Sequence, residues 1–116
     1  VFWGGGSPLR EFTFSEDVAN ALIYLTESYD NPEPINIGVS NEVSISEVVG
    51  LVCNYLKYEG EVMWDKSKPS GQFRKPSSNQ RFLDLGWDEG SYTSFKDGLR
   101  KTCDWFIERY PNVRGV

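Results

Sequence analysis

The segment from Ser44 to Leu56 constrains the fold more than any other part of the sequence. Its apolar residues recur three, four, seven and eleven positions after Ile45, which is the spacing of one face of an α-helix. At its start, Ser44 and Glu47 form the S-x-x-E pattern of a capping box. We therefore predict a helix with one apolar face, and such a face requires other elements to pack against it.

Strand-like and helix-like segments alternate on both sides of this helix. We expect strands at residues 2–3, 11–14, 35–39 and 61–65, and further helical segments at residues 15–29, 78–83 and 94–106, the second of these short. Short strands with about three helices, in a chain of 116 residues, predict one small α/β domain of the α+β kind.

The first and last of these helices also carry apolar stripes. We expect Ser15 to cap the first helix, in which Val18, Leu22 and Leu25 recur at helical spacing. We expect Ser94 to cap the last helix. Its inner face is marked by Phe95, Leu99, Thr102, Cys103 and Phe106. Each stripe predicts a buried side.

Charge and composition exclude several classes of function. The chain has 12 basic and 17 acidic residues, a net charge of −5, which disfavours a nucleic-acid or anionic-membrane partner. No stretch approaches the roughly 20 apolar residues that span a bilayer. No basic segment followed by an apolar run opens the chain, so we expect a cytoplasmic protein. Histidine is absent, which removes His-dependent triads and most zinc sites, and we expect no metal site.

Two further features concern the cysteines and the start of the chain. Cys53 and Cys103 lie 50 residues apart without a CxxC partner, which favours two buried, reduced thiols and leaves a disulfide possible. The chain opens on the apolar residues Val1-Phe2-Trp3 without an initiator Met. Since natural domains usually begin with a polar tail, we expect a fragment of a longer protein.

Two motif-like patterns do not support a dehydrogenase site. Tyr92 and Lys96 have the spacing of a reductase Tyr/Lys pair, but the expected N-cap Ser94 falls between them, so both cannot lie on one helix face. The glycines at 4–6 lack the third glycine of a dinucleotide-binding turn, because Leu9 stands there. A turn whose backbone closely approaches another segment explains these glycines better.

Charge is strongly segregated along the chain. Residues 11–65 contain eleven acidic residues and one basic residue, Lys57, whereas residues 66–81 contain five basic residues and no acid. We call residues 66–77 the basic loop. Such a loop can hold an anion of diphosphate size or can be a solvated surface, and composition alone does not separate the two.

A second group of residues also suits a phosphorylated ligand. Trp3 and Arg10 bracket the turn Gly4-Gly5-Gly6-Ser7-Pro8. An indole ring offers a stacking face, and a guanidinium offers a bidentate fork for phosphate. Ordinary packing and a surface ion pair would account for the same two residues.

Taken together, these motifs resemble those of the GDP-L-fucose synthase family of extended short-chain dehydrogenase/reductases. The resemblance covers essentially the whole chain, in the right order. It rests on W-G-x-G-x-P-x-R-E-F at residues 3–12, P-I-N-I-G at 34–38, V-S-I at 43–45 and K-P-x-G-x-x-R-K at 68–75. Ser15-Glu16-Asp17 entering a helix, and the last helix with Cys103 and Trp105, add to it.

The resemblance implies a function and a missing partner domain. The family epimerises GDP-4-keto-6-deoxy-mannose at C3 and C5 and reduces the 4-keto group with NADPH to give GDP-L-fucose, usually as a homodimer. Residues 1–116 are similar to its C-terminal substrate-binding domain. The N-terminal NADP-binding Rossmann domain and the catalytic residues lie outside them, so the resemblance implies a fragment that holds no catalytic or NADP-binding residue and is inactive alone.

The resemblance also implies which residues bind the GDP-sugar. By motif position these are Trp3, Arg10, Lys68, Ser70, Arg74 and Lys75, with Arg10 as the candidate for the diphosphate. Ser70 departs from the family pattern, which has Asp at this position. A neutral hydroxyl is a weaker acceptor than a carboxylate, so the departure affects substrate affinity or nucleotide choice.

Two alternatives belong to other classes of protein. One is a fragment of another nucleotide-sugar epimerase or dehydratase with a different base or hexose. The other is a free-standing, non-enzymatic interaction module on the same scaffold. Upstream sequence with a GxxGxxG turn and a YxxxK pair would favour an enzyme, whereas a true start at Val1 would favour the module.

Overall fold

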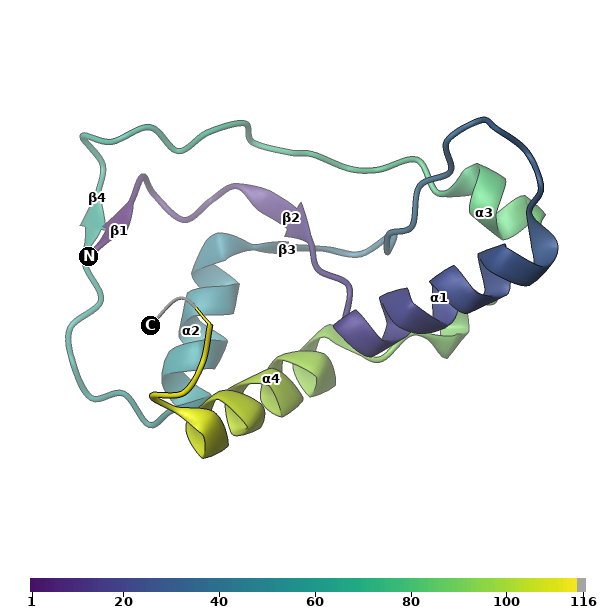
Figure 1. The fold of residues 1–116 in the computed structure, drawn as a ribbon. Helices are drawn as coiled ribbons and strands as arrows, with labels where there is room; N and C mark the ends of the chain where they lie inside the picture. Colours follow the sequence, from purple (N-terminus) through teal and green to yellow (C-terminus); the bar gives the residue numbers. More distant parts are fainter. Residues whose placement is uncertain (115–116) are drawn as a thin grey trace.

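The computed structural model describes residues 1–114 as a small α+β chain, as the sequence predicts (Figure 1). In chain order, the elements are β1 (Phe2–Trp3), β2 (Leu9–Glu11), α1 (Ser15–Ser28), β3 (Glu42–Ser44), α2 (Ile45–Tyr55), β4 (Trp64–Asp65), α3 (Gln80–Asp84), the 3-10 turn η1 (Glu89–Ser91) and α4 (Phe95–Arg109). Across the described residues, every helix is too short or too polar to cross a lipid bilayer.

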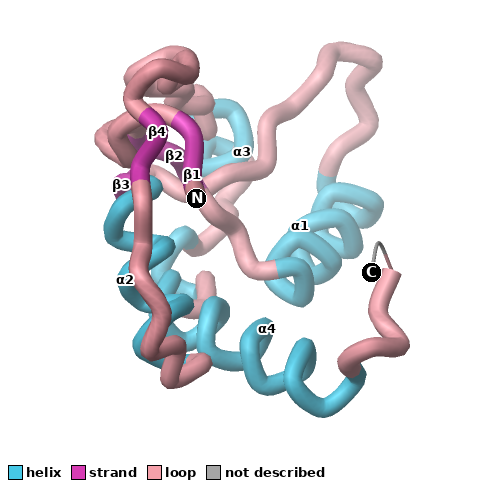
Figure 2. The backbone as a smooth tube through the Cα atoms, turned by 90° about the vertical axis from the view of Figure 1, so that its left-hand side faces the viewer, coloured by secondary structure: helices cyan, strands magenta, loops and turns pink. Residues whose placement is uncertain are grey.

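The strands form two separate two-stranded sheets, β1 with β4 at one end of the molecule and β2 with β3 nearer its middle (Figure 1). Figure 2 views the strands from the β1–β4 end. In the first, β1 and β4 run parallel, and Phe2 lies beside Trp64. In the second, β2 and β3 run antiparallel, and Leu9 lies opposite Ser44. Because β3 leads directly into α2, the pairing of β2 with β3 brings the start of α2 beside the glycine-rich turn. There the Ser46 amide donates to Gly6 O at 2.8 Å.

Local sequence signals set the start of two helices. The Glu47 amide donates to Ser44 Oγ at 3.1 Å, which confirms Ser44 as the cap of α2. The Asp97 amide donates to Ser94 Oγ at 3.2 Å, which confirms the cap of α4. Tyr92 therefore precedes α4 and does not share its face with Lys96. In α1, by contrast, the cap position is Phe14, and Ser15 is already helical.

The apolar core lies between α1 and α3, at the opposite end from β1 and β4 (Figure 1). Ala21 and Leu25 from α1 pack with Phe82, which is 1% exposed. The Trp87 ring stacks on Phe82, with 4.9 Å between ring centroids. Asp17, buried at the start of α1, accepts hydrogen bonds from the amide and the hydroxyl of Thr93 at 2.8 and 3.1 Å. This contact joins α1 to the segment that leads into α4.

Three of the four expected strands differ from the structure. Residues 35–39 form no strand; instead Ile35 and Ile37 pack against the core, and the Asn36 amide group bonds to Ser78 O at 3.1 Å. The alternation of apolar and polar residues at 35–39 therefore reflects burial of one side of an extended segment that pairs with no strand. The strand expected at residues 11–14 lies earlier, at Leu9–Glu11, and that expected at 61–65 is confined to Trp64–Asp65.

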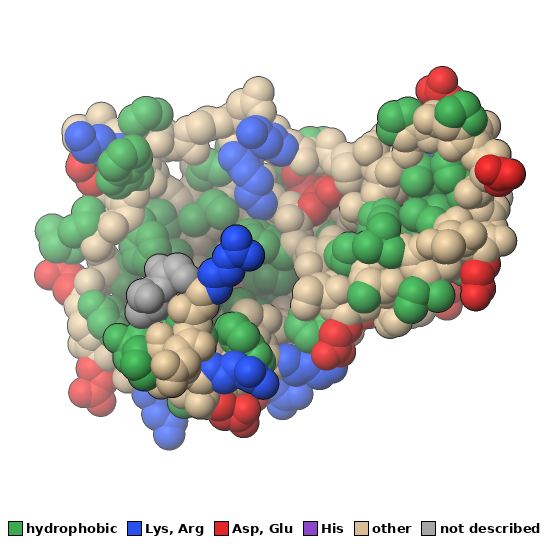
Figure 3. Space-filling view, viewed as in Figure 1, with side chains coloured by type: hydrophobic (Ala, Val, Ile, Leu, Met, Phe, Trp, Pro, Cys, Tyr) green, Lys and Arg blue, Asp and Glu red, His purple; other side chains and the backbone are tan. Residues whose placement is uncertain are grey.

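Much apolar surface is uncovered. The chain exposes 8414 Å², whereas a compact fold of this length exposes about 6,400 Å². Its radius of gyration is 16.8 Å, against about 13 Å for a compact domain. Leu22, expected to be buried, is 54% exposed, and Phe106 is also partly exposed. Figure 3 shows apolar side chains spread over the open face and within a central hollow.

Candidate functional site

The glycine-rich turn and the basic loop, more than 60 residues apart in sequence, are in direct contact. Gly4 has a φ of +75°, and a Cβ there would lie 2.5 Å from Ser70 Oγ. The Gly5 amide donates to Ser70 Oγ at 3.3 Å. Gly6 has a φ of +71°, and a Cβ there would lie 2.7 Å from the Trp64 ring. Gly4 and Gly6 therefore serve close packing, as the sequence predicts.

Arg10 connects β2 to the middle of the basic loop. Its guanidinium donates to Gln72 O at 2.9 Å, more weakly to Phe73 O at 3.5 Å, and to Leu9 O. The Leu9 amide also donates to Phe73 O at 2.8 Å, so the loop follows β2 like an added strand. Because a guanidinium has five N–H donors, Arg10 keeps donors for a further acceptor while these carbonyls fix its orientation.

Trp3 and Lys68 lie together on the exposed side of this contact. The Trp3 side chain is 69% exposed at the end of β1. The Lys68 ammonium lies 5.7 Å from the centroid of the Trp3 ring, within cation–π range. At the start of the loop, Asp65 Oδ1 accepts hydrogen bonds from the amide and the hydroxyl of Ser67 at 3.0 and 2.6 Å. The loop is thus fastened beside β4 before it reaches Lys68.

The remaining two candidate residues are placed differently. Arg74 donates through Nε and Nη2, on one edge of its guanidinium, to one oxygen of Glu42, at 2.8 Å from Nε. This hydrogen bond, and the charge of Glu42, raise the pKa of Arg74. Lys75 is exposed, and no hydrogen bond or ion pair within residues 1–114 holds it. The structure therefore places Lys68 over Trp3, Ser70 against the glycine-rich turn and Arg10 against the middle of the basic loop, whereas Arg74 bonds to Glu42 of β3.

Sequence reasoning missed the acidic residues that fasten the loop. Glu11 accepts two hydrogen bonds from Ser77, at 2.9 Å from the amide and 2.6 Å from the hydroxyl. Glu42, whose side chain is 9% exposed, holds Arg74. Both glutamates were counted among the acidic residues of the sequence, but their contacts with the loop were not predicted. Only the pairing of β2 with β3 brings them together beneath the loop, and no sequence signal indicated that pairing.

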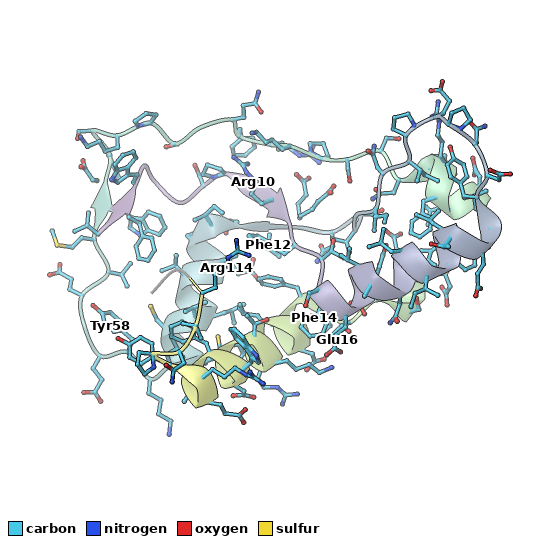
Figure 4. All side chains as sticks on the ribbon, viewed as in Figure 1. Arg10, Phe12, Phe14, Glu16, Tyr58 and Arg114 are labelled. Atoms are coloured by element: carbon cyan, nitrogen blue, oxygen red, sulfur yellow. The ribbon has the colours of Figure 1, made fainter. Side chains whose placement is uncertain are left out.

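A cavity begins just beyond the end of β2. Figure 4 shows Arg10 on β2, and Phe12 just beyond that strand. Phe12 packs against Phe95 of α4, with ring centroids 5.5 Å apart. Both rings line a cavity of about 370 Å³ that Val43 closes from β3. Aromatic faces and guanidinium donors of this kind suit a flat base and a phosphorylated group.

The turn at residues 4–6 differs from a dinucleotide-binding turn. The turn at residues 4–6 leads into strand β2 instead of a helix, and Ser70 and Trp64 occupy the space beside it. NADP phosphates require amide groups at a helix N-terminus, so this turn does not fit that cofactor. No cluster of three or more potential metal ligands occurs within residues 1–114.

Burial raises the pKa of the Tyr92 phenol, which makes Tyr92 a weaker acid.

Comparison with known proteins defines the class first. The model of the NAD dependent epimerase/dehydratase family matches residues 1–38. A crystal structure of an NADP-bound GDP-L-fucose synthetase from Naegleria fowleri superposes with a TM-score of 0.90 at 37% identity. The match covers 97% of this chain and 35% of the Naegleria fowleri chain. The fold is thus that of a part of the extended short-chain dehydrogenase/reductases.

The curated relatives of this chain include several GDP-L-fucose synthases. GDP-L-fucose synthase 1 from Arabidopsis thaliana is 40% identical over 97% of this chain and 34% of its own length. GDP-L-fucose synthase from Sinorhizobium fredii is 40% identical over 90% of this chain and 33% of its own length. The resemblance to the GDP-L-fucose synthase family inferred from the motifs is therefore confirmed. The chain spans about a third of the length of these relatives.

Proposed function

We propose that this chain is the GDP-sugar-binding, C-terminal portion of a GDP-L-fucose synthase. In this proposal the whole enzyme converts GDP-4-keto-6-deoxy-mannose to GDP-L-fucose by epimerisation at C3 and C5 and reduction at C4. Residues 1–116 supply contacts to the nucleotide-sugar, and an N-terminal domain supplies NADPH and the catalytic groups. The whole enzyme acts in the cytoplasm as a homodimer.

The observation that carries the proposal is the contact between the glycine-rich turn and the basic loop. Two segments that the motifs single out independently meet at Gly4 and Ser70. In support of the proposal, the Lys68 ammonium lies over the Trp3 ring and the Arg10 guanidinium donates to Gln72 O of the same loop. A solvated basic surface would not require glycines with left-handed backbone to admit the loop so closely.

Each site residue then has a role. Arg10 binds the diphosphate with the donors that the loop carbonyls leave free, and Lys68 adds a second positive charge. Trp3 provides a flat face for the base or the hexose. Ser70 contacts the ligand through its hydroxyl, and Arg74 and Lys75 add to the positive field over the loop.

The hexose carried by GDP is a second question, and a specific observation bears on it. Relatives include a GDP-L-colitose synthase from Yersinia pseudotuberculosis, 32% identical over 95% of this chain. A GDP-mannoheptose C4 reductase from Campylobacter jejuni superposes with a TM-score of 0.74 at 29% identity. The names of both proteins contain GDP, whereas the sugar attached to GDP differs between them. A related GDP-sugar is therefore the second candidate substrate.

Calorimetric and NMR titration of GDP, GDP-L-fucose and neutral L-fucose into the chain tests the proposal. We expect both GDP compounds to bind, more weakly as salt rises, and free fucose not to bind. Arg10→Ala removes a charge-assisted contact worth roughly 1.5–3 kcal/mol, about one to two decades in affinity. Arg10→Lys is also impaired, because an ammonium lacks the planar fork. Equal affinity of wild type and Arg10→Ala at low salt would remove Arg10 from the site.

The same proposal predicts that the chain alone neither oxidises NADPH nor converts a 4-keto sugar, because hydride transfer depends on the cofactor domain. Protein-dependent NADPH consumption with the keto sugar would contradict the assignment of chemistry to the N-terminal part.

A further inference from the structure

Two glutamates lie directly opposite one another beneath the basic loop. In the antiparallel pair of β2 with β3, Glu11 stands opposite Glu42. Directly opposed residues of such a pair project from the same face, and two like charges there destabilise the pairing. Each carboxylate therefore needs its own partner, and both partners come from the second half of the basic loop.

The partners are three residues apart in that loop. Glu42 takes two N–H groups of Arg74, and Glu11 takes the amide and the hydroxyl of Ser77. These bonds span residues 74–77 and so fix the loop immediately after Gln72 and Phe73, whose carbonyls hold the Arg10 guanidinium. The orientation of Arg10 thus depends on a loop segment that the two glutamates hold in place.

Packing around Glu11 leaves little room for another arrangement. A Cβ at Gly38 would lie 2.5 Å from Ser77 Oγ and 3.1 Å from the Glu11 carboxylate. Asn79, which is 6% exposed, also lies 3.0 Å from Ser77 Oγ. The Glu11–Ser77 contact is therefore enclosed on one side by the backbone at residue 38.

We infer that Glu11 and Glu42 are positioning residues, which fasten residues 74–77 to β2 and β3 and thereby hold Arg10 in its ligand-binding orientation. The inference rests on the proposed function for the ligand itself. The inference also gives Arg74 a second role. Besides adding positive charge near the ligand, Arg74 fastens the loop to Glu42. Neither glutamate is assigned a contact with the diphosphate, since a carboxylate repels it.

The sign of one mutational effect separates positioning from simple electrostatics. Glu42→Gln removes a negative charge next to the basic loop, so Coulomb attraction alone would raise the affinity for GDP. Loss of positioning lowers the affinity instead, by about two- to fivefold, the range that an exposed ion pair contributes. Glu47→Gln is the matched control. It removes the same charge from an exposed carboxylate that makes no side-chain hydrogen bond within residues 1–114.

The test combines GDP titration with amide hydrogen exchange of Leu9 and Ser77 in the chain. The Leu9 amide donates to Phe73 O, next to the fastened segment 74–77, and the Ser77 amide donates to the Glu11 carboxylate. We expect Glu42→Gln to speed exchange at Leu9 and to weaken GDP binding, and Glu47→Gln to do neither. Glu11→Ala should speed exchange at Ser77 and also weaken binding. In hydrogen exchange, a double variant with Arg74→Gln should add nothing to Glu42→Gln, because both changes break the same contact.

Each other result has a definite meaning. If wild type binds GDP and Glu42→Gln binds it equally well or more tightly, the positioning role is overturned and the proposed function stands. Unchanged exchange at Leu9 and Ser77 in the glutamate variants likewise overturns the positioning role. If wild type binds no GDP at millimolar concentration, the proposed function fails for this chain, and the positioning of a ligand residue fails with it.

Discussion

Gly4 and Ser70 are so close that a methyl group added at Gly4 would lie 2.5 Å from the Ser70 hydroxyl oxygen and 2.8 Å from its Cα. Gly4 also has a left-handed backbone, with a φ of +75°. The first prediction follows from this contact. Gly4→Ala must shift the basic loop or strain the turn, and we expect a loss of about 1–3 kcal/mol in the free energy of unfolding.

The neighbouring glycine is the control for that substitution. Gly5 has open space around the position of its missing Cβ, and its φ is not left-handed. Gly5→Ala should therefore leave the urea midpoint nearly unchanged. Equal midpoints for both variants would show that the loop does not rest on the turn in solution.

The second prediction concerns the caps of two helices. Ser94 Oγ accepts the Asp97 amide at the start of α4, so Ser94→Ala should lower the free energy of unfolding by about 1 kcal/mol. Ser15 makes no capping bond in α1, because Phe14 holds the cap position. Ser15→Ala should therefore be close to neutral. Thermal unfolding followed by circular dichroism distinguishes the two, and a larger cost at Ser15 would contradict the assigned start of α1.

The third prediction concerns thiol reactivity. Cys53 and Cys103 are both free thiols, and Cys103 is 7% exposed, whereas Cys53 is half-buried. Burial raises the pKa of the Cys103 thiol, and the charge of Asp104 raises it further. Since the thiolate is the reactive form, Cys103 should react more slowly than Cys53 with a disulfide reagent at pH 8. The difference should persist until the pH passes the raised pKa of Cys103.

Thiol counting completes that test. Under denaturing, non-reducing conditions we expect two free thiols per chain, and none would indicate a disulfide between Cys53 and Cys103. Equal rates for the two thiols in the folded chain would show that α4 does not shield Cys103.

The fourth prediction concerns the small core. Phe82 is 1% exposed between α1 and the stacked Trp87 ring, so Phe82→Ala should cost about 3–5 kcal/mol. Phe73, on the basic loop, is 61% exposed, and Phe73→Ala should cost little. Urea unfolding curves provide the comparison. A tolerated Phe82→Ala would mean that α1 and α3 do not form the core in solution.

Features within one or two turns of chain were predictable from the sequence. The caps at Ser44 and Ser94 depend on a hydroxyl and an amide three residues apart, so the local pattern is sufficient to identify them. Charge segregation and the motif order were likewise readable, and the family resemblance that rests on them is confirmed. Individual roles for Trp3, Arg10, Lys68, Ser70, Arg74 and Lys75 stay predictions.

Strand pairing was beyond the local pattern. Residues 35–39 alternate like a strand, but a strand exists only where a partner completes its ladder, and here Ile35 and Ile37 meet the core instead. The extent of β4 was equally decided by its partner, since only Trp64 and Asp65 meet β1.

The sequence by itself therefore determined the starts of α2 and α4, the small α+β class and the two segments that carry the ligand motifs. Tertiary structure alone decided that the glycine-rich turn receives Ser70, that Glu11 faces Glu42, and that Arg74 pairs with Glu42. The physical reason is range. A cap or a helical stripe is settled by contacts within a few residues, whereas these contacts join positions 31 to 66 residues apart and depend on how the whole chain packs.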